Sequence, residues 1–299
     1  MVLSRTARQR LLFAVLCVVW GATWLALKVG VTAVPPGFFS GTRWTVAGLL
    51  LFGWRRAQGK RLRIRRRLIG RITLVAVLMV LMNALIQNYG LRYVGSGLAS
   101  VISSALMPIG LMTFSVALGQ EQFSRRQGWA TALGICGIFL LFGPSALAGR
   151  MDASELLGAL GVIVGTLTYA LGSVLSRPLM RMLTPAEIAA STNLIGGVLL
   201  LTLSVLFEPG AREAMTGDWG IAAWTAWLFL LLPGSLGATV IYFVLVRDWG
   251  ASRTGTYAFV SPVVAVLLGI TLLGEQIELS SALGMAVMLV AAGIALKRS

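Results

Sequence analysis

Residues 69–90 read IGRITLVAVLMVLMNALIQNYG, an almost unbroken apolar run that follows the most basic segment of the chain. A transmembrane helix needs roughly 17–25 such residues, because a rise of about 1.5 Å per residue must cross a hydrocarbon core of about 30 Å. Nine other runs have comparable length. We therefore predict an all-α integral membrane protein with ten transmembrane helices, over residues 11–29, 37–54, 69–90, 96–118, 128–144, 156–177, 187–207, 222–246, 254–273 and 281–297.

The composition of the whole chain agrees with a lipid environment. Hydrophobic residues make up 57% of the 299 residues and charged residues only 12%, a balance too apolar for one water-soluble core. A net charge of +15 would suggest nucleic-acid binding in a soluble protein. Here the Lys and Arg residues stand in short islands between apolar runs, so we expect no nucleic-acid partner and interpret the charge as a topology signal.

The Lys and Arg residues predict the orientation, because cytoplasmic loops keep cations and translocated loops do not. With the N-terminus inside, most cations lie in the cytoplasm, including the nine between Arg55 and Arg71. Both termini are then cytoplasmic, and the expected location is the bacterial inner membrane, crossed many times. We also expect the basic loop from Arg55 to Arg71 to bind anionic lipid head groups.

The chain repeats itself. Residues 20–54 align with residues 169–203 at an offset of 149, and later positions align at an offset of 154. The paired residues are Trp20 with Tyr169, Lys28 with Arg177, Pro108 with Pro262, and Glu121 with Glu275. Five spans is an odd number, so the second unit enters the membrane from the opposite side. We predict a 5+5 inverted repeat, with units at residues 1–148 and 149–299 and a substrate site near the membrane midplane between them.

These motifs resemble the drug/metabolite transporter superfamily, and within it the ten-helix EamA-type exporters. The residues that carry the resemblance are the Trp20-Gly21 step, Lys28, Pro36, Arg43 with Ala47, and the Pro–Glu pair that closes each half. The chain looks most similar to the aromatic amino-acid exporter subgroup. This resemblance implies export of small amphipathic metabolites, aromatic amino acids first, while other metabolites and cationic drugs stay open. One departure is that Arg43 has Thr192 as its repeat partner.

Two other classes, a membrane-embedded enzyme and a lipid flippase, are disfavoured. The chain has no His and no phosphate-binding loop, and Cys17 and Cys136 lie in separate spans without metal-ligand spacing. We therefore expect no enzymatic activity, no cofactor and no metal, and a monomer is one possible oligomeric state. No Asp or Glu lies deep in a span. Because proton-coupled antiporters need such a group, we expect facilitative transport by alternating access.

Polar and aromatic side chains deep in the spans are the candidate substrate-binding residues, because such groups are unfavourable against lipid. Asn83 and Gln87, four residues apart, share one helix face. The full set is Trp20, Thr23, Trp24, Asn83, Gln87, Ser100, Ser104, Tyr169, Ser173, Tyr242, Tyr257 and Ser261. For the hydroxyl residues, helix packing is the alternative, and the amide pair needs either a neighbouring helix or an aqueous cavity. Tryptophans near span ends, including Trp44, are expected to form interfacial belts.

Two cations and two prolines inside spans have alternative interpretations. Lys28 and Arg43 either extend to the lipid head groups or hold a substrate carboxylate. Pro108 and Pro262 each lack the N–H that would bond the carbonyl four residues earlier. Each proline can therefore produce a kink that shapes packing, act as a hinge for alternating access, or leave a free carbonyl that accepts an ammonium group. The glycines at 158, 161 and 165 are expected to allow close helix contact.

Overall fold

The computed structural model describes residues 5–59, 66–94, 96–147, 153–264 and 279–296. Throughout these residues the regular structure is helical, with no strand. Five described helices are long and apolar enough to cross a membrane: Thr6–Ala33, Arg66–Tyr93, Ala153–Arg181, Pro185–Phe207 and Ile221–Trp249. Ile102–Ala117 and Leu283–Ile294 are shorter apolar helices. The prediction of an all-helical membrane protein is confirmed, whereas the ten-span organisation and the side on which the termini lie stay predictions.

The elements of the first half follow the hydrophobic runs closely. They are α1 (Arg5–Ala33), α2 (Pro36–Ala57), α3 (Arg66–Ala76), the π-helix η1 (Val77–Met82), α4 (Asn83–Tyr93), α5 (Ser96–Ala117) and α6 (Arg125–Leu147). Pro36 separates α1 from α2, because proline cannot continue a helix but fits its first turn. The segments α3, η1 and α4 together form one long helix, which is the run over residues 69–90.

The second half is helical as well. They are α7 (Ala153–Ser176), the 3-10 helix η2 (Arg177–Arg181), α8 (Pro185–Phe207), the 3-10 helix η3 (Glu213–Thr216), α9 (Ile221–Phe229), the π-helix η4 (Leu230–Ala238), α10 (Thr239–Trp249), α11 (Ala251–Thr254) and α13 (Leu279–Leu296). A further helix is described over residues 257–264. The rest of the predicted span 254–273, and Glu275, lie outside the described residues.

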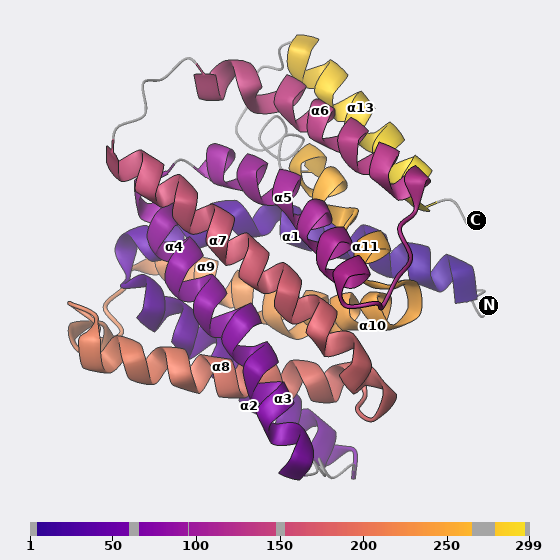
Figure 1. Ribbon diagram of the computed structural model, residues 1–299. Helices are drawn as coiled ribbons and strands as arrows, with labels where there is room; N and C mark the ends of the chain where they lie inside the picture. The colour runs from indigo at the N-terminus through magenta and orange to yellow at the C-terminus, as the bar shows by residue number, and fades with distance from the viewer. Residues whose placement is uncertain (1–4, 60–65, 95, 148–152, 265–278, 297–299) are drawn as a thin grey trace.

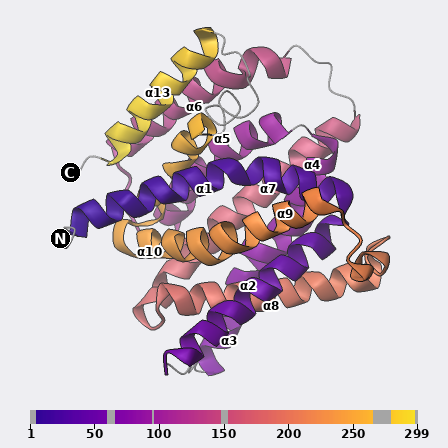
Figure 2. The same ribbon diagram turned by 180° about the vertical axis from the view of Figure 1, so that it is seen from behind.

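Contacts between the two halves follow the sequence repeat. Helix α2 lies along its repeat equivalent α8, and α6 lies along its equivalent α13, while α4 packs on α7 and their equivalents α10 and α1 also pack on each other. Figures 1 and 2 also show that α1 begins and α13 ends on the same side of the molecule. Such exchange of equivalent partners is the arrangement that a pseudo-two-fold axis between the halves would produce.

Helices α2 and α8 run antiparallel and are joined at both ends by a carboxylate. At one end Arg55 donates to Glu187, with 2.8 Å between Nη2 and Oε1. At the other end the amides of Gly37 and Phe38 donate to Glu208 over 3.1 Å and 3.0 Å, which satisfies the free N–H groups at the start of α2. The Arg55–Glu187 pair also gives Arg55 a protein partner, while head-group binding by the Arg55 to Arg71 loop stays a prediction because residues 60–65 lie outside the described part.

Glycines bring α4 and α7 into close contact, as the sequence predicts. A Cβ atom added to Gly158 would lie 2.7 Å from the Gly90 carbonyl oxygen, and one added to Gly161 would lie 2.9 Å from that of Ile86. At Gly165 the added atom would lie 2.7 Å from Cβ of Gln87. The expectation of close packing at these three glycines is therefore confirmed, and it places Gln87 directly on the surface of α7.

Two π-helices interrupt the long helices of the two halves at related positions. At the repeat offset of 154, residues 77–82 correspond to residues 231–236. The first range forms η1, and the second lies inside η4. Pro233 lies within η4 and lacks an amide donor. By contrast, α5 continues as an α-helix through Pro108, and Pro262 lies within the helix of residues 257–264. The hinge role of these two prolines stays a prediction, and the changes in helical hydrogen bonding lie at η1 and η4.

Candidate functional site

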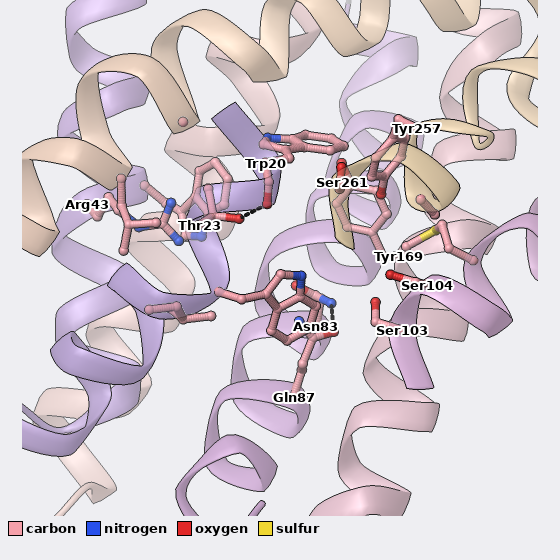
Figure 3. Close-up of a pocket in the computed structure, with 17 residues that line it drawn as sticks. Trp20, Thr23, Arg43, Asn83, Gln87, Ser103, Ser104, Tyr169, Tyr257 and Ser261 are labelled. Carbon is pink, nitrogen blue, oxygen red and sulfur yellow. Dashed lines mark hydrogen bonds between the residues drawn. The ribbon is translucent and has the colours of Figure 1, made fainter. Parts of the chain in front are cut away.

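A cavity of about 150 Å³ lies between the two halves of the chain. Helices α1, α2, α4, α5, α7, the π-helix η4 and the helix of residues 257–264 all contribute to its wall (Figure 3). The lining residues are Trp20, Thr23, Trp24, Leu27, Arg43, Trp44, Asn83, Gln87, Ser103, Ser104, Met107, Tyr169, Leu230, Gly234, Tyr257, Ala258 and Ser261. A largely apolar cavity of about this volume can hold one benzene ring, so the space suits a single aromatic side chain.

Most of the predicted site residues lie in this wall. Those that line it are Trp20, Thr23, Trp24, Arg43, Asn83, Gln87, Ser104, Tyr169, Tyr257 and Ser261. Ser173 and Tyr242 do not line it: both are fully buried and hydrogen-bonded to each other behind the wall. The side chain of Ser100 lies outside the described residues. Thr23 donates to the carbonyl of Trp20 at 2.7 Å, so its hydroxyl serves its own helix although the residue lines the cavity.

Aromatic rings from both halves form one side of the cavity. The Trp20 ring lies 4.7 Å from that of Tyr257, 5.1 Å from that of Tyr242 and 6.4 Å from that of Tyr169, measured between centroids. The contacts to Tyr257 and Tyr169 are edge-to-face, the geometry that ring quadrupoles favour. Trp20 and Tyr169 are partners in the sequence repeat, so the cluster forms where the two halves meet.

The amide pair of α4 contacts both a neighbouring helix and the cavity. Asn83 Nδ2 donates to Gln87 Oε1 over 3.0 Å (Figure 3). It also donates to the Gly165 carbonyl of α7 over 3.0 Å. Both residues are partly buried and line the cavity. The two sequence interpretations therefore apply together: Asn83 fixes α4 to α7, and its bond to Gln87 orients that amide at the cavity wall.

Arg43 is the charged residue of the described cavity wall. Its side chain is buried, its Nη1 atom donates to Ser235 Oγ over 2.8 Å, and its Cζ atom lies 4.2 Å from the centre of the Trp44 ring. No described carboxylate forms an ion pair with it, and its buried Nε atom has no hydrogen-bond partner in the described structure. A buried cation needs a counter-charge or strong hydrogen bonds. The buried position of Arg43 contradicts its extension to the head groups, and a substrate carboxylate at this residue stays a prediction.

The structure corrects the interpretation of two other residues. Trp44, predicted to belong to an interfacial belt, lines the cavity beneath Arg43 instead. Lys28 lies outside the cavity wall, and its Nζ atom donates to the carbonyls of Leu91 and Val94 over 2.6 Å and 3.2 Å. These carbonyls end α4, where helices leave acceptors unsatisfied. Lys28 thus stabilises the end of α4, a role that neither sequence interpretation included.

Several lining residues were not among the sequence candidates. They are Leu27, Trp44, Leu230, Gly234 and Ala258. The position next to Arg43 was the available signal for Trp44, whereas apolar residues in spans carry no signal that separates a cavity wall from a lipid contact. Among the described residues, no group of three or more His, Cys, Asp or Glu side chains could hold a metal ion.

Comparison with known proteins identifies a family. The model of the EamA-like transporter family matches the chain twice, over residues 9–143 and 156–296. The predicted boundary at residue 148 falls between the two matches and stays a prediction. The fold is also similar to a solved structure titled only as a crystal structure of protein, with a TM-score of 0.79 at 20% identity over 98% of this chain and 99% of that one.

Curated relatives cover most of the chain. The uncharacterized inner membrane transporter YedA of Escherichia coli K12 is 31% identical over 270 residues, which cover 89% of this chain and 83% of that protein. The uncharacterized transporter YoaV of Bacillus subtilis is 29% identical over 266 residues, with 89% of each chain covered. Both names state transport, and neither states a substrate.

Proposed function

Since the chain belongs to the EamA-like transporter family, it is a multi-pass membrane transporter rather than an enzyme, and we propose that it exports small amphipathic metabolites, aromatic amino acids first among them. The proposed setting is the bacterial inner membrane. The proposed mechanism is alternating access between two inverted halves, with substrate bound at their junction.

One observation carries the proposed substrate class: a buried guanidinium without a described carboxylate partner lies in a wall that also contains aromatic rings, amides, hydroxyls and aliphatic side chains. A substrate carboxylate at Arg43 would supply the missing counter-charge, and a charge-assisted hydrogen bond of this kind contributes about 1.5–3 kcal/mol. The aromatic side chain would lie against Trp20, Tyr169 and Tyr257, where each ring pair adds about 0.5–1.5 kcal/mol beyond burial.

The substrate ammonium group also has acceptors in this wall. Pro108 and Pro262 lack the N–H that would bond the carbonyls of Ser104 and Ala258, and both of these residues line the cavity. We propose that these two carbonyls, one from each half, receive the ammonium group. A cationic drug would gain nothing from Arg43 and would be repelled by it, so the cavity favours a zwitterion over the cationic-drug alternative.

Transport is proposed to be facilitative. Three acidic residues serve helix ends: Glu187 and Glu208 flank the α2–α8 pair, and Glu121 accepts from the Ala251 amide over 2.9 Å at the start of α11. The described cavity wall contains no carboxylate, and the chain has no His. A group that would load and release a proton beside the substrate is thus absent from the described wall.

Flux into liposomes tests the proposal. Purified protein would be reconstituted and assayed with aromatic, branched and basic amino acids and with a quaternary ammonium dye. We expect saturable exchange of the aromatic amino acids and none of the dye. Failure of every aromatic amino acid would reject this substrate class and leave the family assignment intact.

The energetics need a separate assay. With a substrate that is exchanged, an imposed pH gradient is expected to cause no accumulation above the equilibrium concentration. Accumulation that follows the pH gradient and disappears with a proton ionophore would show proton coupling and reject the facilitative mechanism.

A further inference from the structure

A second pocket, of about 390 Å³, lies apart from the substrate cavity. It forms where the turn after α5 meets η2 and the end of α10. Gly119 and Gln120 come from the turn, Arg177 and Arg181 come from η2, and Arg247 comes from the last turn of α10. Three arginines from two separate segments of the chain therefore line one pocket.

The arginines of this second pocket exceed the acidic groups that they contact. Arg177 Nη1 donates to Glu121 Oε1 over 3.3 Å and to the Gln120 carbonyl over 3.2 Å. Arg247 Nε donates to Asp248 Oδ1 over 2.8 Å. Arg181 is exposed and forms no hydrogen bond or ion pair with a described residue. Two carboxylates thus offset three arginines, and each guanidinium has five N–H donors.

We propose that this pocket binds a phosphate group, carried either by an anionic lipid or by a soluble phosphate compound. Guanidinium groups bind phosphate oxygens through paired hydrogen bonds, and Arg181 and Arg247 can approach one phosphate from η2 and from α10. A water molecule occupies about 30 Å³ in the liquid, so the pocket has room for a phosphate with several waters. The sequence predicts the cytoplasmic side for all three arginines, and basic pockets between transmembrane helices on that side suit lipid head groups.

Binding at this place would connect two segments that lie far apart in the sequence. Segment η2 leads from α7 into α8, whereas Arg247 lies in the last turn of α10. A phosphate held by Arg181 and Arg247 would join these two ends by charge-assisted hydrogen bonds and stabilise the folded protein, because a ligand that binds only the native state raises its stability. This proposal is independent of which solute the substrate cavity carries.

The test compares ligands and variants on the full-length protein in detergent. Thermal unfolding would be measured with inorganic phosphate against chloride at equal ionic strength, and with phosphatidylglycerol against phosphatidylcholine. Retention of one phosphatidylglycerol molecule would be followed by native mass spectrometry. The variants are Arg181→Gln and Arg247→Gln, and the control is Arg212→Gln, which removes one charge from an exposed residue outside both the pocket and the basic loop.

We expect phosphate, phosphatidylglycerol or both to raise the unfolding temperature of the wild-type protein and of Arg212→Gln. Each pocket variant should weaken this binding by about tenfold, the loss expected for one charge-assisted hydrogen bond. A response to the lipid alone identifies a head group, and a response to phosphate alone identifies a soluble ligand. The proposal is overturned if neither ligand stabilises the protein, or if Arg181→Gln and Arg247→Gln bind as tightly as Arg212→Gln does. Because Arg181 is exposed, its replacement should leave the ligand-free unfolding temperature unchanged, and Arg181→Lys should bind better than Arg181→Gln.

Discussion

At position 43 a guanidinium group lies buried against the Trp44 ring, and Ser235 is its hydrogen-bond partner in the described structure. Burial makes an unpaired charge costly, and this side chain is buried in the cavity wall. Its partner Ser235 belongs to η4, where the hydroxyl also donates to the Leu230 carbonyl over 3.0 Å. The π-helix therefore positions the serine that holds Arg43 beside the cavity.

Replacement of Arg43 separates recognition of a carboxylate from recognition of a ring. Arg43→Gln keeps a hydrogen-bond donor and removes the charge. The apparent affinity for an aromatic amino acid should fall by roughly 10-fold to 100-fold, because a charge-assisted bond contributes about 1.5–3 kcal/mol. The affinity for the corresponding aryl amine, which lacks the carboxylate, should not fall. Liposome flux at several substrate concentrations measures both, and an equal loss for the two solutes would contradict a carboxylate site at Arg43.

Alanine variants of Gln87 and Asn83 are expected to have different effects on the unfolding temperature. Gln87→Ala should reduce flux with little change in unfolding temperature, since the side chain lines the cavity. Asn83→Ala should reduce flux and also lower the unfolding temperature, because it removes the bond to the Gly165 carbonyl. Losing a buried hydrogen-bond partner costs about 1–3 kcal/mol. Gln58→Ala, at the exposed end of α2, is the control, and unchanged flux in both variants would assign the pair to helix packing alone.

Among the helices, the α4–α7 contact depends on the absence of side chains at glycine positions. Gly165→Ala would place a methyl group 2.7 Å from Cβ of Gln87, and overpacking of this kind costs about 1–3 kcal/mol. The unfolding temperature should fall, and flux should fall with it because Gln87 would shift. In Gly53→Ala, the new methyl group meets nothing within 4 Å, so this control should be neutral or stabilised by up to about 1 kcal/mol. The measurement is the unfolding temperature of both variants in detergent. A Gly165→Ala protein as stable as the wild type would contradict the close contact.

The α2–α8 pair depends on a carboxylate at one end. Glu208→Gln would weaken the cap on the amides of Gly37 and Phe38 and remove negative charge from the positive end of α2. Loss of a helix cap costs about 0.5–2 kcal/mol, so the unfolding temperature should fall. Glu213→Gln, on the exposed η3 segment, should unfold as the wild type does. If the two variants behave alike, the contact of Glu208 with α2 has no measurable effect on stability.

For the whole molecule, orientation in the membrane can be tested directly. In a variant with Cys17 and Cys136 replaced, Thr216→Cys and Gln58→Cys place single thiols on exposed residues in η3 and after α2. The predicted topology puts η3 outside and the end of α2 inside. A membrane-impermeant maleimide should label Thr216→Cys in intact cells and should label Gln58→Cys only after permeabilisation. The opposite pattern would reverse the predicted orientation.

The sequence by itself determined the class of the molecule, its helical content, its resemblance to a transporter family and most of the residues that line the cavity. These follow from local properties: hydrophobic length sets a span, and a polar or aromatic residue deep in a span needs protein or water around it. Asn83, Gln87 and Trp20 could be selected for that reason before any helix was placed.

Only the tertiary structure decided how these residues are paired. Lys28 meets a carbonyl 63 residues away and Arg43 meets a serine 192 residues away. Sequence spacing within one helix gives no information on such contacts, so Trp44 was assigned to a belt and the capping role of Lys28 was missed. The π-helices were missed as well, because each is a change in hydrogen-bond register that depends on the neighbouring helices. Composition and length determine what enters the membrane, and packing between the halves determines which side chains face the cavity.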